Sequence, residues 1–201
     1  MTIKDVKRNF VTDEATALFL ERPISAVTIK DIAASSGVGE ATVYRYFAGK
    51  NELVVASALK LQSAVETKFT AFDAGKNGYQ NIYRFFEAYL DTFRENPGHY
   101  RFLSEFDAYC VSEGVTGLDE YSDNFDKFKD AFMKSYRDGV ADGSVRKIEN
   151  VELFYYSATH SVLSLCKKLA AEGHMIRQDD LTDKAQEIET LIDVILHYLK
   201  A

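Results

Sequence analysis

Long apolar runs, proline and cysteine are all scarce in this sequence of 201 residues. No apolar stretch approaches the roughly 18 residues of a membrane-spanning helix, and the amino terminus lacks the hydrophobic segment of a secretion signal. Only 2 prolines, with 46% hydrophobic and 27% charged residues, are typical of a folded, helical protein. We therefore expect a cytoplasmic protein without a membrane partner.

Residues suited to metal binding or catalysis are also few. Cys110 and Cys166 are isolated thiols without CxxC spacing, which favours buried side chains over a disulfide. The 4 histidines have neither an i,i+4 partner nor a nearby cysteine. GxSxG, HExxH and phosphate-loop motifs are all missing from the sequence. The sequence thus predicts no enzyme, no metal site and no cofactor.

Negative charge is concentrated away from the amino terminus. Residues 1–53 hold seven basic and seven acidic side chains, so the remainder carries the whole net charge of -7. A polyanion is repelled by the acidic part and can be approached only through residues 1–53.

Hydrophobic periodicity and turn residues predict an all-α protein of about nine helices. In the first helix Ile3, Val6, Phe10, Ala17 and Leu18 follow the period of an amphipathic face. Two short helices follow, one from Thr28 to the stop at Ser35-Ser36-Gly37 and one from about Gly39 to Gly49. The longer helices are expected at 3–20, 50–72, 79–95, 98–112, 118–139, 149–172 and 182–200.

The two short helices have the arrangement of a helix-turn-helix. Val43 and Phe47 lie four residues apart and should face inward. That leaves Glu40, Ala41, Thr42, Tyr44, Arg45 and Tyr46 on the outside. Tyrosine and arginine can reach phosphate oxygens, and arginine can also bind guanine, which favours DNA binding. The alternative is a purely structural helical hairpin on which Tyr44 and Tyr46 pack sideways.

Residues 28–53, TIKDIAASSGVGEATVYRYFAGKNEL, resemble the DNA-binding region of the TetR family of bacterial transcriptional regulators. The matching features include the Thr28 start with Ile32-Ala33, the Gly37-Val38 turn, Tyr44-x-x-Phe47 and Lys50-x-Glu52-Leu53. Beyond residue 53 the resemblance is one of length and helix count.

The resemblance implies a DNA-binding domain at 1–49 and a ligand-binding and dimerisation domain at 50–201, joined by the helix at 50–72 acting as a lever. Thr28 and Lys50 would contact phosphate, and Tyr44 and Tyr46 would hold the DNA backbone. Thr42 and Arg45, with Glu40 or Ala41, would lie against base edges. The acidic Glu40 either binds a cytosine amino group or weakens binding by repulsion.

A ligand site is expected among the aromatic residues of the second domain, where twenty of the 26 lie between Phe69 and Tyr156. The resemblance implies a site formed by Phe86, Tyr89, Phe106, Tyr109, Cys110, Phe128 and Tyr155. Its ligand would be a hydrophobic or aromatic small molecule, because the acidic body repels polyanions. The alternative is that these aromatics are plain core.

The last helix has an unusually broad apolar face, which predicts a homodimer. The expected interface combines Ile188, Leu191, Ile192, Ile195 and Leu199 with Leu153, Ser157, His160, Ser161 and Ser164 of the preceding helix. The alternative is a terminal helix docked on its own subunit.

Together these inferences predict a transcriptional regulator, in the first place a repressor, that a small molecule releases from a palindromic DNA operator. The alternative keeps the fold but makes the protein a DNA-bound scaffold whose second domain binds another protein.

Overall fold

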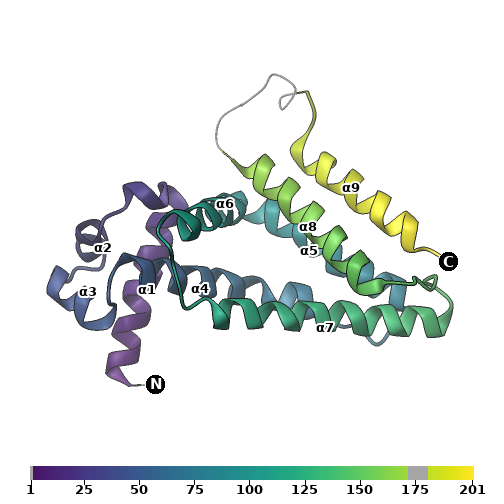
Figure 1. Cartoon of the computed structure of the whole chain (residues 1–201), viewed down its shortest axis with the longest axis horizontal. Coiled ribbons are helices and arrows are strands. Elements are labelled where there is room, and N and C mark those ends of the chain that lie inside the picture. Colours follow the sequence, from purple (N-terminus) through teal and green to yellow (C-terminus); the bar gives the residue numbers. More distant parts are fainter. Residues whose placement is uncertain (1, 172–180) are drawn as a thin grey trace. The chain divides into compact units, whose positions relative to one another are not determined.

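A computed structural model describes residues 2–171 and 181–201, and in these ranges the secondary structure is helical apart from an isolated bridge between Val145 and Lys200. The helices are α1 (Ile3–Glu21), η1 (Ile24–Ala26), α2 (Ile29–Ser35), α3 (Glu40–Tyr46), α4 (Lys50–Thr70), α5 (Gly78–Glu95), α6 (Pro97–Ser112), α7 (Asp119–Asp142), α8 (Val151–Ala170) and α9 (Lys184–Leu199) (Figure 1). This confirms the all-α prediction. The expected end of a helix near residues 172 and 173 lies outside the described ranges.

Local sequence signals account for where these helices begin. Thr2 with Asp5, Thr28 with Asp31, and Asn77 with Gln80 each form a capping box, in which side chain and backbone satisfy each other's free groups. None of the helices in the described ranges is long and apolar enough to cross a membrane.

The helices pack as two compact units. One contains the residues up to Ala64 together with Arg101–Ser122, and the other contains Val65–Tyr100 and Asp123–Ala201. This division follows packing, whereas the predicted boundary after residue 49 concerns function and stays a prediction.

In the N-terminal unit the buried face of α1 differs from the predicted one. Ile3, Val6 and Phe10 are exposed, while the core is formed from Val11, Thr12, Ala15, Thr16 and Phe19. The threonines can be buried because their hydroxyls find partners inside. That of Thr16 donates to the Thr12 carbonyl at 2.7 Å and lies 3.0 Å from the Ser57 hydroxyl. Counting only apolar residues therefore predicted the wrong stripe.

Most of α6 belongs to the same unit. Phe102 packs against Phe19 with ring centroids 6.3 Å apart. The Glu105 carboxylate accepts a hydrogen bond from the Ile24 amide at 2.6 Å, and the Arg101 guanidinium donates to the Leu20 carbonyl. These contacts fix α6 to the end of α1 and to η1.

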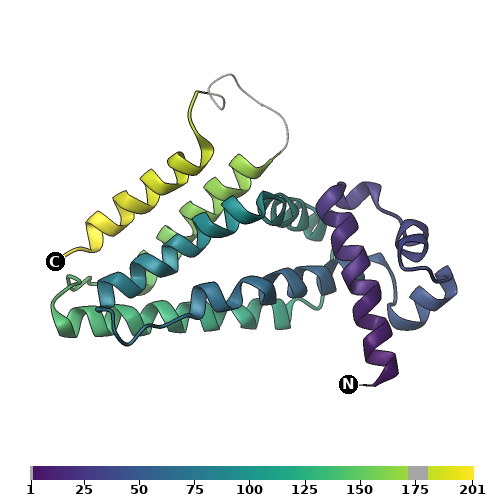
Figure 2. The same ribbon diagram turned by 180° about the vertical axis from the view of Figure 1, so that it is seen from behind.

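In the second unit α5, α8 and α9 lie side by side (Figure 2). An aromatic cluster fills the space between the end of α4 and helices α5, α7 and α8, with Phe85 contacting Phe69, Phe132 and Tyr155 at centroid separations of 5.5 to 6.2 Å. At the start of α5, Gly78 lies so close to Gly139 of α7 that a Cβ on either residue would overlap neighbouring atoms. Two glycines therefore set the spacing of these helices.

Candidate nucleic-acid interface and ligand pocket

The turn between α2 and α3 fixes the orientation of α3. Gly37 adopts a φ of 61°, in the left-handed region that glycine enters without strain. The Val38 amide then donates to the Ala33 carbonyl at 3.0 Å, which closes the turn. Val43 and Phe47 are buried, as predicted, and anchor α3 from below.

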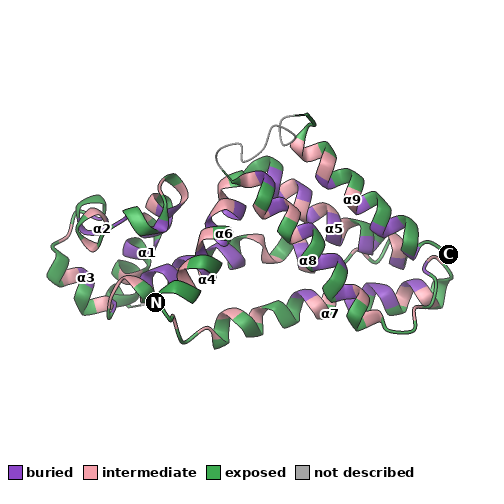
Figure 3. Cartoon of the chain, turned by 45° about the horizontal axis from the view of Figure 1, so that its top comes forward, coloured by how far each residue is buried: buried purple, intermediate pink, exposed green. Residues whose placement is uncertain are grey.

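The outer face of α3 carries the predicted DNA-binding residues. Glu40, Ala41, Tyr44 and Arg45 are exposed, and Thr42 and Tyr46 are half-buried (Figure 3). Tyr44 leaves 54% of its surface open to solvent. The Arg45 guanidinium lies 5.1 Å from the centre of the Tyr46 ring and donates to its hydroxyl at 3.3 Å. A cation and two phenols are thus presented together on one short helix.

Thr28 is exposed, but its hydroxyl is engaged locally. It donates to the Asp31 carboxylate at 2.7 Å and accepts from the Asp31 amide at 3.1 Å. Hydrogen bonds from the backbone and hydroxyl of Thr28 lower the pKa of Asp31. The predicted phosphate contact from this hydroxyl would therefore require it to leave Asp31.

Lys50 is half-buried at the start of α4. Its ammonium group donates to the Ser25 carbonyl at 3.4 Å and lies 5.5 Å from the centre of the Tyr109 ring. Burial lowers the pKa of Lys50, while the charge of Glu113 acts in the opposite sense. The hydroxyl of Tyr109 donates to the Asn51 side chain at 2.7 Å. Tyr109, predicted to line the ligand site, thus lies beside the predicted DNA-binding residue Lys50.

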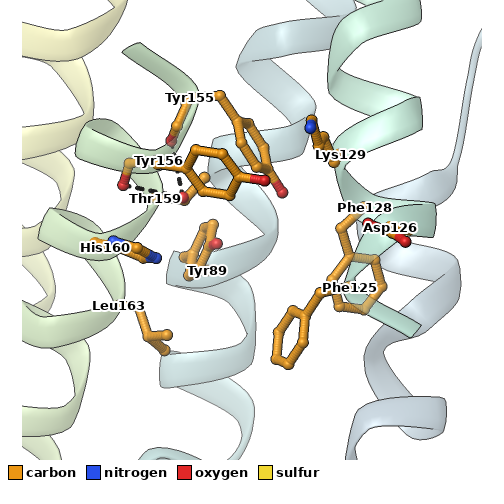
Figure 4. Close-up of a pocket in the computed structure, with 10 residues that line it drawn as sticks. All are labelled: Tyr89, Phe125, Asp126, Phe128, Lys129, Tyr155, Tyr156, Thr159, His160 and Leu163. Carbon is orange, nitrogen blue, oxygen red and sulfur yellow. Dashed lines mark hydrogen bonds between the residues drawn. The ribbon is translucent and has the colours of Figure 1, made fainter. Parts of the chain in front are cut away.

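A pocket of about 190 Å³ lies in the second unit. Its walls come from α5, α7 and α8 (Figure 4). The lining residues are Tyr89, Phe125, Asp126, Phe128, Lys129, Tyr155, Tyr156, Thr159, His160 and Leu163.

Three of the predicted ligand residues, Tyr89, Phe128 and Tyr155, line this pocket. Phe86 is buried, stacked 6.4 Å from Tyr89 by ring centroids, and lies outside the lining. Phe106, Tyr109 and Cys110 belong to the N-terminal unit, so the structure does not place them in this pocket.

Sequence reasoning missed several lining residues on α8. Tyr156, Thr159, His160 and Leu163 are spaced by three and four residues, which places them on one helix face. That spacing was a usable signal. No sequence signal marks Lys129 as a lining residue, because its place in the pocket depends on how α7 packs against α8.

The ammonium group that lines the pocket is already paired. The Lys129 ammonium lies 2.7 Å from the Glu152 carboxylate and 5.3 Å from the centre of the Tyr156 ring. The hydrogen bond to Glu152, and to a smaller extent the hydrogen bond to Tyr156, raises the pKa of Lys129. Burial raises the pKa of Tyr89 and of Tyr155, so both phenols stay protonated.

The predicted dimer residues divide between two faces. Leu153, Ser157, His160, Ser161 and Ser164 are all exposed on α8. Leu191 is half-buried, whereas Ile188, Ile192, Ile195 and Leu199 are buried inside their own unit, where α9 packs on α5 and α8. The outward face of α9 instead exposes Val194 and Tyr198. The broad apolar face of α9 is therefore largely used within the subunit.

Within residues 2–171 and 181–201, His, Cys, Asp and Glu side chains form no group of three or more that could hold a metal ion. Cys110 and Cys166 are both free thiols.

Comparison with known proteins gives a match to a family model and matches to individual proteins. Residues 11–57 match the family model described as "Bacterial regulatory proteins, tetR family". The nucleoid occlusion factor SlmA of Haemophilus influenzae (strain PittGG) is 30% identical over 104 residues, covering 51% of this chain and 48% of that protein. The chain thus spans about half the length of this relative.

Two further relatives extend over more of the chain. The HTH-type transcriptional repressor KstR2 of Rhodococcus jostii is 26% identical over 174 residues, covering 76% of this chain and 74% of that protein. The solved structure of the ketosteroid transcriptional regulator KstR2 of Mycobacterium tuberculosis shares the fold with a TM-score of 0.66 at 17% identity, covering 96% and 95% of the two chains. The helix-turn-helix therefore lies in a segment that matches the tetR family of bacterial regulatory proteins, and the chain shares the fold of the solved KstR2 structure.

Proposed function

We propose that this protein is a homodimeric repressor that binds a palindromic DNA operator through α3 and is released by a small, hydrophobic or aromatic ligand. The observation that carries the proposal is the outward placement of Tyr44 and Arg45 on a helix anchored by buried Val43 and Phe47. Such a helix can enter the major groove, where arginine binds guanine and tyrosine binds phosphate. The KstR2 relative, which is named as a repressor, supports the direction of regulation.

Release by a ligand requires that the ligand bind better to the form with lower operator affinity. The pocket among α5, α7 and α8 supplies a place for such a ligand in the second unit. Its phenylalanine and tyrosine walls support an aromatic or hydrophobic compound.

The DNA proposal predicts that Arg45→Ala weakens operator binding about tenfold, because one arginine contact to a base edge or phosphate is lost. Fluorescence anisotropy with a labelled duplex carrying the palindrome upstream of the protein's own gene would measure this. The salt concentration must be held constant, since phosphate contacts depend on it.

A matched control is Lys200→Ala, which removes an exposed cation from the other unit. It should leave operator affinity unchanged. Equal losses in both variants would mean that Arg45 acts only through overall charge, and no specific binding by the unaltered protein at any salt concentration would refute DNA recognition.

The homodimer proposal predicts that Val194→Glu shifts the protein toward monomer, weakening association at least about tenfold. Val194 is 63% exposed on α9, and Leu153 is 63% exposed on α8. Burying a carboxylate between subunits without a partner is costly, whereas in the monomer the residue faces water. Analytical ultracentrifugation across a concentration series would measure the change.

Val111→Glu is the matched control, because Val111 is 84% exposed but belongs to α6 in the N-terminal unit. The dimer proposal expects this variant to associate normally. If Val111→Glu dissociates the protein and Val194→Glu does not, the interface lies on another face.

A second candidate function is a DNA-bound scaffold whose second unit binds a protein. The match to SlmA, named as a nucleoid occlusion factor, favours it. The two candidates differ in the pocket, since a scaffold needs no small-molecule ligand there.

A further inference from the structure

The pocket in the second unit is small for a ligand site. Its volume is about 190 Å³, whereas pockets for drug-sized ligands usually hold about 300–1,000 Å³. An apolar cavity of about 150 Å³ is known to accept benzene. The pocket therefore has room for one substituted aromatic ring and not for the four fused rings of a steroid.

Its walls suit the faces of an aromatic ring. Phe125 and Phe128 of α7 lie opposite Tyr156 and Leu163 of α8, with Tyr89 of α5 between them (Figure 4). The Phe125 and Phe128 rings already meet edge to face, with centroids 5.7 Å apart. A further ring can stack or meet edges with these groups in the same way.

The Tyr89 hydroxyl is a polar group of this lining without a protein partner in the described part of the chain. Tyr89 enters a hydrogen bond through its backbone carbonyl, which accepts from the Tyr100 hydroxyl at 3.0 Å. Its own hydroxyl has no hydrogen-bond partner among residues 2–171 and 181–201. A ligand that displaces water from this hydroxyl must offer it a hydrogen bond or leave it unpaired.

The charges around the pocket disfavour an anion. The Lys129 ammonium is paired with Glu152 at 2.7 Å, and the Asp126 carboxylate also lines the pocket. A ligand carboxylate would have to compete with Glu152 for Lys129 and would approach Asp126. A neutral ligand avoids both the competition with Glu152 and the repulsion by Asp126.

We propose that this pocket binds a neutral phenol with a single aromatic ring, and that the Tyr89 hydroxyl selects it by a hydrogen bond to the phenol oxygen. The proposal rests on the proposed function in taking this pocket as the ligand site, and it goes further by fixing the class of compound. Tyr89 is thus the specificity-determining residue of the site.

The test is isothermal titration calorimetry of the full chain without DNA, using p-cresol, toluene and p-toluate as probes of nearly equal size. We expect p-cresol to bind about fivefold more tightly than toluene, because toluene leaves the Tyr89 hydroxyl unpaired. p-Toluate and the four-ring steroid progesterone should not bind. In Tyr89→Phe the preference for p-cresol over toluene should fall to about one, while toluene still binds.

Tyr83→Phe is the matched control, because Tyr83 lies on the same helix, is exposed and does not line the pocket. It should keep the full preference for p-cresol. Four results would each overturn the proposal: equal binding of p-cresol and toluene, retention of the preference in Tyr89→Phe, tighter binding of p-toluate or progesterone, or no binding of any probe.

The measurement separates this proposal from the DNA proposal. Binding of p-cresol by a protein that ignores the operator would refute only the DNA proposal. A protein that binds the operator but none of the probes would refute only the phenol site.

Discussion

Gly78→Ala is expected to lower the free energy of unfolding by about 3 kcal/mol, the upper range for overpacking a well-packed site. A Cβ at residue 78 would overlap the backbone nitrogen and Cα of Gly139 and would lie 2.5 Å from the Ser135 carbonyl oxygen. These are backbone atoms of α7, so no rotamer change can make room. The start of α5 would have to move away from α7.

Chemical unfolding followed by circular dichroism would measure this loss as a lower denaturant midpoint. Gly49→Ala is the matched control, because its added Cβ meets nothing within 4 Å. That variant should be as stable as the original protein or slightly more so. An unchanged midpoint for Gly78→Ala would mean that the helices do not approach as closely as described.

Acidification is expected to cost about 3 kcal/mol of stability through His99 alone. This histidine is buried at the start of α6, with its ring 5.3 Å from that of Tyr100. Burial, and secondarily the charge of Lys68, lowers the pKa of His99 from 6.5 to about 4. The unfolded chain therefore binds this proton more readily than the folded chain does.

The sign of the effect follows from that difference. Above about pH 6.5 His99 is neutral in both states and costs nothing, and between about pH 6.5 and 4 the unfolded state gains the proton first. The free energy of unfolding falls as pH falls through this window and no longer changes through His99 below it. A shift of about 2.5 pH units corresponds to about 3 kcal/mol.

The measurement compares unfolding free energies at pH 7 and pH 4 in the original protein and in His99→Gln. The variant should lose most of the His99 contribution to the pH dependence, whatever its stability at pH 7. His197→Gln, at an exposed position of α9, is the matched control for removal of a histidine. Identical pH slopes for His99→Gln and the original protein would contradict the buried, neutral histidine.

The helices could be predicted because their ends carry local signals. Thr28 with Asp31 begins α2, Gly37 ends the turn after it, and Asn96-Pro97 separates α5 from α6. The outward direction of Arg45 was predictable in the same way, since Val43 and Phe47 fix the inward side of α3.

The pocket and the core of α1 depend on information that a single helix does not carry. Tyr109 could not be distinguished from Tyr89 by sequence, because only the packing of α6 places it beside Asn51 in the N-terminal unit. From the sequence alone Thr16 is expected at the surface, because its hydrogen-bond partners, Thr12 and Ser57, are known only from the structure. Aromatic composition predicted a pocket with aromatic walls, and tertiary packing decided which aromatics form it.

The attachment of α6 to α1 and η1 also limits how this protein can be recombined with its relatives. A chimaera made by exchanging residues 1–49 would separate Phe19, Leu20 and Ile24 from Phe102, Arg101 and Glu105. Residues 1–49 and α6 would then each pack against residues of another protein, at contacts that are buried in the original protein. New operator specificity is therefore easier to introduce by changing the outer residues of α3 than by exchanging residues 1–49.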